Sequence, residues 1–235
     1  MDLDEIIAKL EQMGTEQTKR TFIRHGAREP LFGVKVGDLK KLVKDIRKNQ
    51  PLVYSLFDTG IHDAMYLAGL AVDPKSISRE QLQAWVRAAY WYMLAEYTVA
   101  GAAAESAYAL ELSKKWMEAP EEMTAACGWS TYTNYISITE DGQLDLEELE
   151  LLLRRVRQTV HQEQNRVRYT MNGFVIGVGA WVPALYEEAL STAGAIGAVS
   201  VNMGQTACKV PLAEEYIRKV KEQGKLGVKR KTCIC

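Results

Sequence analysis

The sequence predicts an all-α protein built as a solenoid of antiparallel helix pairs. Apolar residues recur at intervals of about 3.6 positions along nearly the whole chain, which is the period of a helix with one buried face. The only brief candidate for a strand is residues 199–202, and no linker rich in Pro, Gly or Ser divides the chain. About a dozen short helices joined by short loops fit either a globin-like ball or a solenoid, and the recurrence of paired helices favours the solenoid.

The first third of the chain contains three predicted helices with recognisable end signals. The first covers residues 2–13, where one apolar stripe stops at Gly14. Thr15 can cap the second helix, and Gly26 can close it. Asp38 is expected to cap the third helix. The apolar face of this third helix consists of Leu39, Leu42, Val43 and Ile46.

The same periodicity continues to the C-terminal region. Pro51 is predicted to begin the fourth helix, because proline is tolerated in a first helical turn. Further helices are expected near residues 61–72, 78–89, 91–104, 106–118, 120–137, 144–162, 165–181, 183–194 and 205–223. We therefore expect one domain over residues 1–224, followed by a basic tail over residues 225–235.

The composition is that of an ordinary soluble globular protein, with 47% hydrophobic and 25% charged residues. The first residues are acidic and no apolar run approaches the ~20 residues of a membrane span, so we expect a cytoplasmic protein without a membrane partner. The cysteines are too scattered for a disulfide framework or a zinc site, and we expect reduced thiols. They are Cys127, Cys208, Cys233 and Cys235.

Charge is strongly segregated although 30 acidic and 29 basic residues nearly cancel. Residues 19–48 carry a net charge of +7, residues 154–168 carry +4 and residues 218–235 carry +6, which leaves −18 for the remainder. In a solenoid, segments distant in sequence can line one groove, and a groove of Lys and Arg binds a phosphate backbone. The alternative is that each basic run is a solvated helix face.

Motifs for metal binding and nucleophilic catalysis are not supported. Residues 137–148 superficially match a calcium loop, but Ser137 and Thr139 stand where carboxylates are needed. The histidines His25, His62 and His161 have no spaced metal partners. We therefore expect neither a metal nor another cofactor.

The segment 90–97 places aromatic rings and a carboxylate within two helical turns. Tyr92 and Glu96 are four residues apart, so a ring and a carboxylate can converge on one ligand. Rings stack on a cationic alkylated base, and a carboxylate stabilises positive charge that develops on the sugar as the bond breaks. Core packing explains the same residues without a ligand. Later in the chain, Gly173, Gly177 and Gly179 permit close approach of a helix or a ligand.

Four segments resemble the DNA alkylation repair (AlkD-like) family, which is built from HEAT-like helical repeats. They are residues 31–42, residues 91–99, residues 165–179 and the tail from Thr206 to Thr232. The resemblance implies a right-handed, C-shaped superhelix of HEAT-like (ARM-type) helix pairs, with a basic concave face that holds duplex DNA. In active relatives it implies hydrolysis of the N-glycosidic bond of alkylated purines, such as 3-methyladenine and 7-methylguanine, without a metal or cofactor.

The signature of the active relatives is degenerate in this chain. Tyr92 stands at the position of a Trp, Glu96 at that of an Asp, and Phe174 at that of a later Trp. The position of an Arg falls near Gly128, where no Arg is available. Glu keeps the charge but moves the carboxylate by one methylene, and the missing Arg removes a charge-assisted contact. Fold and DNA binding are therefore expected to carry over better than catalysis.

The resemblance and the charge pattern together assign the candidate residues. Glu96 is the candidate catalytic carboxylate. The residues expected to contact a base or lesion are Trp91, Tyr92, Trp129 and Phe174. The residues expected to contact the DNA backbone are Lys35, Lys40, Lys41, Arg154, Arg155, Arg166, Arg168, Lys229, Arg230 and Lys231.

Three functions remain open on this basis. The first is a monomeric protein that binds damaged, distorted or branched double-stranded DNA through a basic groove, with weak or lost glycosylase activity. The second is an active DNA glycosylase of base excision repair. The third is a HEAT-type scaffold whose groove binds an acidic protein or RNA.

Overall fold

Residues 1–234, which the computed structural model describes, form helices joined by loops and contain no β-strand. The predicted all-α class is confirmed, and residues 199–202 lie in a loop. The helices are α1 (Leu3–Met13), α2 (Glu16–Arg24), α3 (Val36–Ile46), α4 (Gln50–Asp58), α5 (His62–Ala71), α6 (Arg79–Ala88), the π-helix η1 (Met93–Val99), α7 (Ala100–Ala104), α8 (Ala109–Met117), α9 (Glu122–Ile138), α10 (Leu146–Thr159), α11 (Asn165–Trp181), α12 (Tyr186–Ile196) and α13 (Ala213–Glu222). Single 3-10 turns flank α10 and precede α12.

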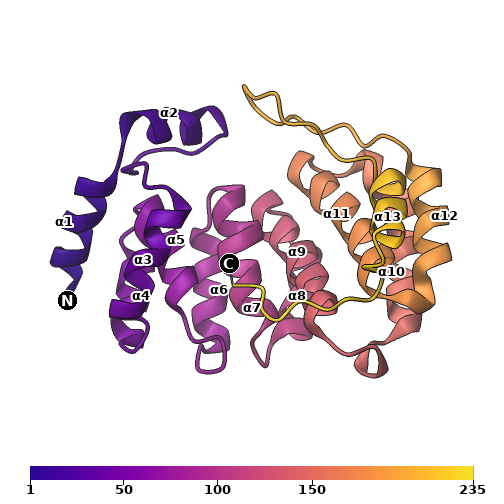
Figure 1. Cartoon of the computed structure of the whole chain (residues 1–235), viewed down its shortest axis with the longest axis horizontal. Coiled ribbons are helices and arrows are strands. Elements are labelled where there is room, and N and C mark those ends of the chain that lie inside the picture. The colour runs from indigo at the N-terminus through magenta and orange to yellow at the C-terminus, as the bar shows by residue number, and fades with distance from the viewer. Residues whose placement is uncertain (235) are drawn as a thin grey trace.

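The helices follow one another along an arc (Figure 1). From α4 onward they pack as pairs: α4 with α5, α6 with η1, α8 with α9, α10 with α11, and α12 with α13. The helices α3, α5, η1–α7, α9, α11 and α13 also contact one another in succession, and we call them the inner row. This arrangement is the predicted solenoid of helix pairs. The basic concave face remains a prediction.

The sequence located most helices but misplaced several ends. Thr15 caps α2 as predicted, because its hydroxyl accepts a hydrogen bond from the amide of Thr18. The prediction that Asp38 caps α3 is wrong: α3 begins at Val36, and Asp38 lies in its first turn beside Lys41. A helix dipole favours a carboxylate anywhere in the first turn, so the acidic residue marked the start only approximately.

Two predicted helices also differ in their extent or type. Residues 205–212 form a loop instead of the start of a helix, and only Ala213–Glu222 is helical. Pro211 accounts for this, since proline disfavours helical backbone in the residue before it. The helix predicted over residues 91–104 is divided into the π-helix η1 and the short α7.

Two hydrophobic clusters meet at α9. The first fills the N-terminal half and includes the stacked rings of Phe57 and Trp85, with centroids 4.2 Å apart. The second fills the C-terminal half. Gly128 on α9 faces α8, and a Cβ atom there would lie 2.5 Å from the amide nitrogen of Met117. The missing side chain thus allows α9 to pack closely against α8. This close packing holds α9 in its position between η1 and α11.

Asp63 ties the N-terminal helices to the inner row. Its carboxylate, fully buried at the start of α5, accepts hydrogen bonds from the amides of Phe32 (2.6 Å), Gly33 (3.3 Å) and Val34 (2.7 Å). Gly33 has φ +82°, and a Cβ atom there would lie 2.5 Å from the amide nitrogen of Lys19. The turn after α2 therefore requires glycine at this position.

The described part of the tail, residues 225–234, runs back from α13 to the middle of the arc (Figure 1). The amide of Gly227 donates to the carbonyl of Ala180 on α11, and the amide of Arg230 donates to that of Ser137 on α9. Further on, the carboxylate of Glu105 accepts from the amides of Cys233 and Ile234. The tail thus packs against the C-terminal ends of successive inner-row helices.

The cysteines differ in their burial. Cys127 and Cys233 are buried and Cys208 is exposed, while Cys235 lies outside the described residues. In residues 1–234, no helix combines the length and apolarity needed to cross a membrane. The same residues contain no group of three His, Cys, Asp or Glu side chains arranged to hold a metal ion.

Lys229 joins the ends of two helices, and its substitution should loosen both. Its ammonium group donates to the carbonyls of Ile136 (3.1 Å) and Trp181 (2.7 Å), at the C-termini of α9 and α11, and pairs with Asp141 (2.9 Å). We expect Lys229→Met to lower the free energy of unfolding by about 2 kcal/mol, since these carbonyls would have no charged partner. Urea denaturation measures this change. The exposed neighbour Lys231, changed to Met, should have little effect, and equal losses of stability would contradict the assignment.

His62 should make stability depend on pH. It is 1% exposed at the start of α5, between the rings of Phe22 and Trp91, and burial lowers its pKa from 6.5 to about 4, against the opposing charge of Asp63. Because the folded-state pKa is depressed, this stability is full above pH 6.5 and is lost as the pH falls toward 4.

Between pH 7 and pH 4, the free energy of unfolding of the wild type should therefore fall by about 3 kcal/mol more than that of His62→Gln. Denaturant titrations across this range measure the difference. His161→Gln, a change at an exposed histidine, should keep the wild-type dependence. Parallel pH profiles for the wild type and His62→Gln would contradict the prediction.

Candidate functional site

A buried ion pair between η1 and α11 lies at the centre of the inner row. The carboxylate of Glu96 accepts from Nε of Arg166 at 2.7 Å through one oxygen and from Nη2 at 2.6 Å through the other. The two side chains are 4% and 9% exposed. Two parallel bonds between a carboxylate and a guanidinium form the strongest common geometry of such pairs. Both oxygens of the candidate catalytic carboxylate are thus already bound within the chain.

The π-helix explains how this segment presents its side chains. In a π-helix, residues five positions apart come together, and such turns often occur at functional sites. The rings of Tyr92 and Tyr97 accordingly lie 6.5 Å apart on the same side, with Glu96 between them in sequence. Gly69 on α5 makes room for this turn, since a Cβ atom there would lie 2.2 Å from a methyl carbon of Thr98.

Two tyrosines enclose the guanidinium of Arg166. Its central carbon lies 4.4 Å from the ring centroid of Tyr92 and 4.2 Å from that of Tyr169. Cation–π attraction at these distances holds the guanidinium between the rings. Tyr92 and Glu96 therefore converge on one group, and in the structure that group is Arg166. Tyr169 is not among the residues predicted from the sequence, although its spacing of three residues from Arg166 on one helix is a usable signal.

Burial and pairing act in opposite directions on the titration of this pair. Burial raises the pKa of the Glu96 carboxyl, and the guanidinium of Arg166 works against that rise. Burial by itself lowers the pKa of Arg166, but its hydrogen bonds to Glu96 raise it above the usual value. Each partner thus favours the charged form of the other in surroundings that disfavour an isolated charge.

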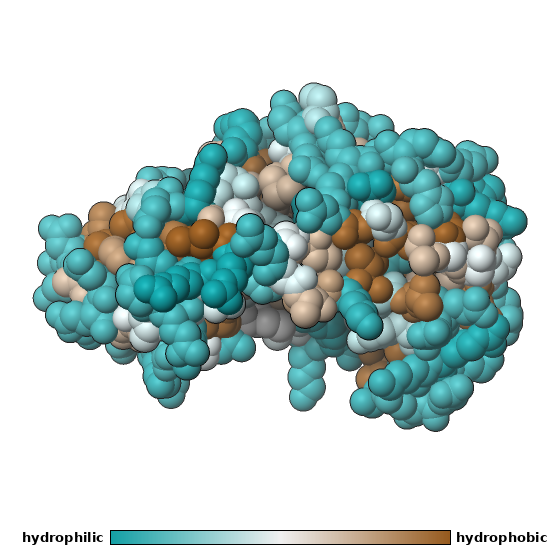
Figure 2. All heavy atoms as spheres, turned by 90° about the horizontal axis from the view of Figure 1, so that it is seen from above, coloured by the Kyte–Doolittle hydropathy of each residue, from teal (hydrophilic) through white to brown (hydrophobic). Residues whose placement is uncertain are grey.

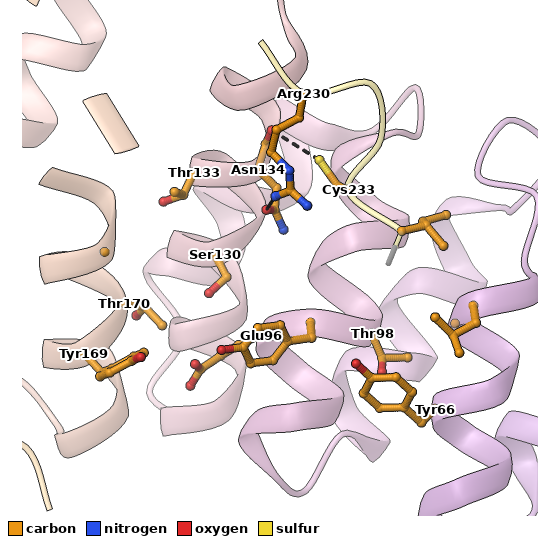
Figure 3. A pocket seen from close by; sticks show the side chains of 15 residues that line it. Tyr66, Glu96, Thr98, Ser130, Thr133, Asn134, Tyr169, Thr170, Arg230 and Cys233 are labelled. Carbon is orange, nitrogen blue, oxygen red and sulfur yellow. Dashed lines mark hydrogen bonds between the residues drawn. The ribbon is translucent and has the colours of Figure 1, made fainter. Parts of the chain in front are cut away.

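Two cavities flank the ion pair. The first, of about 310 Å³, lies between α5, η1, α9, α11 and the tail (Figure 3). The second, of about 270 Å³, lies on the side of α2 and is lined by Arg166 and by residues 90–92. The loop after α12 closes over this second cavity, because the amide of Gln205 donates to the carbonyl of Arg24 at the end of α2.

The other aromatic candidates have different surroundings. Trp91 lines the second cavity but is 4% exposed, and its indole N–H donates to the carbonyl of His25 at 2.8 Å. Trp129 and Phe174 are fully buried in the second cluster, with ring centroids 5.3 Å apart, and line neither cavity. Of the four residues predicted to contact a base, Trp91 and Tyr92 therefore lie next to a cavity.

Some of the basic candidates lie on the inner row of helices and others lie outside it. Lys35, Lys40 and Lys41 are exposed in or beside α3 of the inner row. Arg154 and Arg155 lie on α10, which pairs with α11 from outside the inner row, and they form ion pairs with Glu150 and Glu118. The segment 154–168 therefore does not present its charges on one face.

The remaining basic candidates lie on α11 and the tail. Arg168 is half-buried, Lys231 is exposed, and Arg230 donates to the side chain of Asn134 at 3.3 Å. Lys229 directs its ammonium group at two carbonyls and Asp141. Seen from above, most of the face is covered by hydrophilic residues, with hydrophobic atoms visible in its middle (Figure 2).

The sequence matches the protein family described as DNA alkylation repair enzyme over residues 6–209. The chain belongs to this family. Two uncharacterized proteins, from Listeria innocua and Listeria monocytogenes, are each 35% identical to the chain over 226 and 228 residues. These alignments cover 94% of this chain and 97% and 98% of the relatives.

A solved structure shares the whole fold, with a TM-score of 0.92, 35% identity and complete coverage of both chains. It is described as belonging to a new family of proteins related to the HEAT-like repeat DNA glycosylases with affinity for branched DNA structures. The predicted HEAT-like architecture is therefore confirmed. This member of the DNA alkylation repair enzyme family lacks an Arg near Gly128, and Arg166 supplies a guanidinium to Glu96 from a different helix.

The ion pair can be tested by a double-mutant cycle. Arg166→Met should lower the free energy of unfolding by about 3–5 kcal/mol, because it leaves a buried carboxylate without a partner. The double variant Glu96→Gln/Arg166→Met should be destabilised less than the single variant Arg166→Met, since no buried charge remains. Denaturant titrations of the wild type, both single variants and the double variant give the coupling. Additive changes in stability would contradict a coupled pair.

Proposed function

We propose that this protein binds branched or otherwise distorted double-stranded DNA and does not excise bases. Membership of the DNA alkylation repair enzyme family and the likeness to a structure with affinity for branched DNA support the binding part. The two hydrogen bonds between Glu96 and Arg166 support the absence of base excision, and they are the observation on which the proposal depends.

Electrostatics at Glu96 disfavours base excision. Cleavage of the N-glycosidic bond develops positive charge on the sugar, which a free carboxylate nearby would stabilise. In this chain the guanidinium of Arg166 pairs with Glu96, so the net charge of the pair is zero, and the pair is almost completely buried. Exposing the carboxylate would require breaking both hydrogen bonds and leaving the guanidinium of Arg166 unpaired in the interior.

The DNA backbone is held by exposed basic groups in this proposal. Lys35 and Lys40 on the α3 side and Lys231 on the tail are exposed, and Lys41 is exposed but paired with Asp38, whereas Lys229 is engaged with carbonyls. Binding of this kind releases counterions, so the affinity should fall steeply as salt increases. We further propose that the protein acts as a monomer in the cytoplasm, without a metal or cofactor.

The alternative function is an active alkylpurine glycosylase. The description of the matched family favours it, and Glu96 retains the negative charge of the family's carboxylate position. The two functions differ in one measurable product, the free base. A scaffold for acidic proteins would lack both base release and a preference for branched DNA.

Gel shifts and base-release assays on the same DNA preparations separate these functions. Wild-type protein should bind a three-way junction more tightly than a linear duplex of equal length, and should release no base from methylated duplex at enzyme excess. Lys40→Glu/Lys41→Glu should weaken binding and reduce the slope of log affinity against log salt by about 1 for each phosphate that the variant no longer neutralises. The comparison variant Arg154→Glu, on α10, should have a smaller effect. Release of methylated base by the wild type, abolished by Glu96→Gln, would establish the alternative.

A further inference from the structure

The cavity of about 310 Å³ has aromatic and hydrogen-bonding walls. Tyr97 from η1 and Tyr169 from α11 line it, and Tyr97 is 51% exposed, which is unusual for a ring in the middle of a fold. Figure 3 shows the arrangement, with Tyr169 and Thr170 on one side, Tyr66 on the other, and Arg230 and Cys233 of the tail above. The polar side chains with which α9 lines the cavity are Ser130, Thr133 and Asn134.

This combination matches the surfaces of an unpaired nucleobase. A base offers two π-faces, which stack on tyrosine rings, and an edge of donors and acceptors, which hydroxyl and amide side chains can satisfy. Of the charged residues that line the cavity, Glu96 is already paired with Arg166, and Arg230 of the tail donates a hydrogen bond to Asn134. A flat group with a polar edge therefore matches the aromatic and hydrogen-bonding walls of this cavity.

The size of the cavity also selects a single base. Small-ligand sites in proteins begin at ~300 Å³, and this cavity lies at that lower end. A duplex does not fit such a volume, whereas one base that has left its stack does. Gly173 on α11 contributes to this space, because a Cβ atom there would meet no other atom within 4 Å.

We propose that this cavity takes one unpaired nucleobase presented at a DNA branch point, with Tyr97 and Tyr169 as its stacking surfaces. The inference rests on the proposed function and adds the feature of branched DNA that is recognised. Branch points expose unstacked bases that a continuous duplex does not, so an unpaired base in the cavity distinguishes the two forms. Phosphate contacts then supply affinity common to both.

The test compares two three-way junctions that differ only in their unpaired nucleotides. One carries two unpaired thymidines at the branch point, and the other carries two abasic residues in the same places, so that the backbone is kept and the bases are removed. Wild-type protein should bind the thymidine junction about tenfold more tightly, which is within the range of base–aromatic stacking. Equal affinity for the two junctions would overturn the inference.

Two independent variants should remove this difference. Tyr97→Ala deletes a stacking surface, and Gly173→Leu fills the cavity from a helical position that tolerates a side chain. Both should reduce the affinity for the thymidine junction to that for the abasic junction, and leave the latter unchanged. Tyr97→Phe should keep the wild-type preference, because stacking needs the ring and not the hydroxyl group.

Matched controls exist at distant positions. Tyr216 on α13 is also 51% exposed, and Gly142 also has no atom within 4 Å of a Cβ position, so Tyr216→Ala and Gly142→Leu should behave as the wild type. Equal decreases in affinity for both junctions from Tyr97→Ala and Gly173→Leu would overturn the inference. Failure of the proposed function is recognised separately, as binding of the wild type to the thymidine junction that is no tighter than its binding to a linear duplex of equal length.

Discussion

The ion pair between Glu96 and Arg166 connects the two halves of the protein. Glu96 belongs to the π-helix beside the N-terminal cluster, and Arg166 begins the helix that carries much of the C-terminal cluster. The pair is joined across α9, which packs against both elements. Because each charge is buried, each is tolerated only while the other is in place. The enclosing tyrosines, the turn of η1 and the two flanking cavities are all arranged around this one contact.

Catalysis and binding place different physical requirements on a carboxylate at this position. A carboxylate that must stabilise a developing cation needs to approach it without a competing positive group. A carboxylate that orders a binding surface needs a partner that fixes its orientation. The same residue type at the same place in the fold can therefore serve either purpose, and we propose that the guanidinium of Arg166 assigns Glu96 to the second. The identity of the residue at the carboxylate position does not by itself distinguish the two purposes.

The sequence predicted the class, the helix pairing and most helix positions, because these depend on local periodicity and capping. Thr15 is an example, since the hydroxyl and the amide that it caps are three residues apart. The sequence did not predict that Arg166 is a buried partner of Glu96, because the two residues are 70 positions apart and arginine side chains are usually exposed. Trp129 lies in the core for a complementary reason: large rings are buried by packing alone, whether or not a ligand exists.

The returning tail changes how the solenoid behaves as a whole. A row of stacked repeats has contacts only between neighbours, so its last repeat can open without disturbing the rest. Here residues 225–234 leave the final helix and reach Glu105 at the middle of the arc. The tail thereby links the last helix pair to the middle of the solenoid. Unfolding of the C-terminal end must therefore break contacts between residues that are far apart in the sequence. Local opening near the C-terminus is converted into a more global and cooperative event.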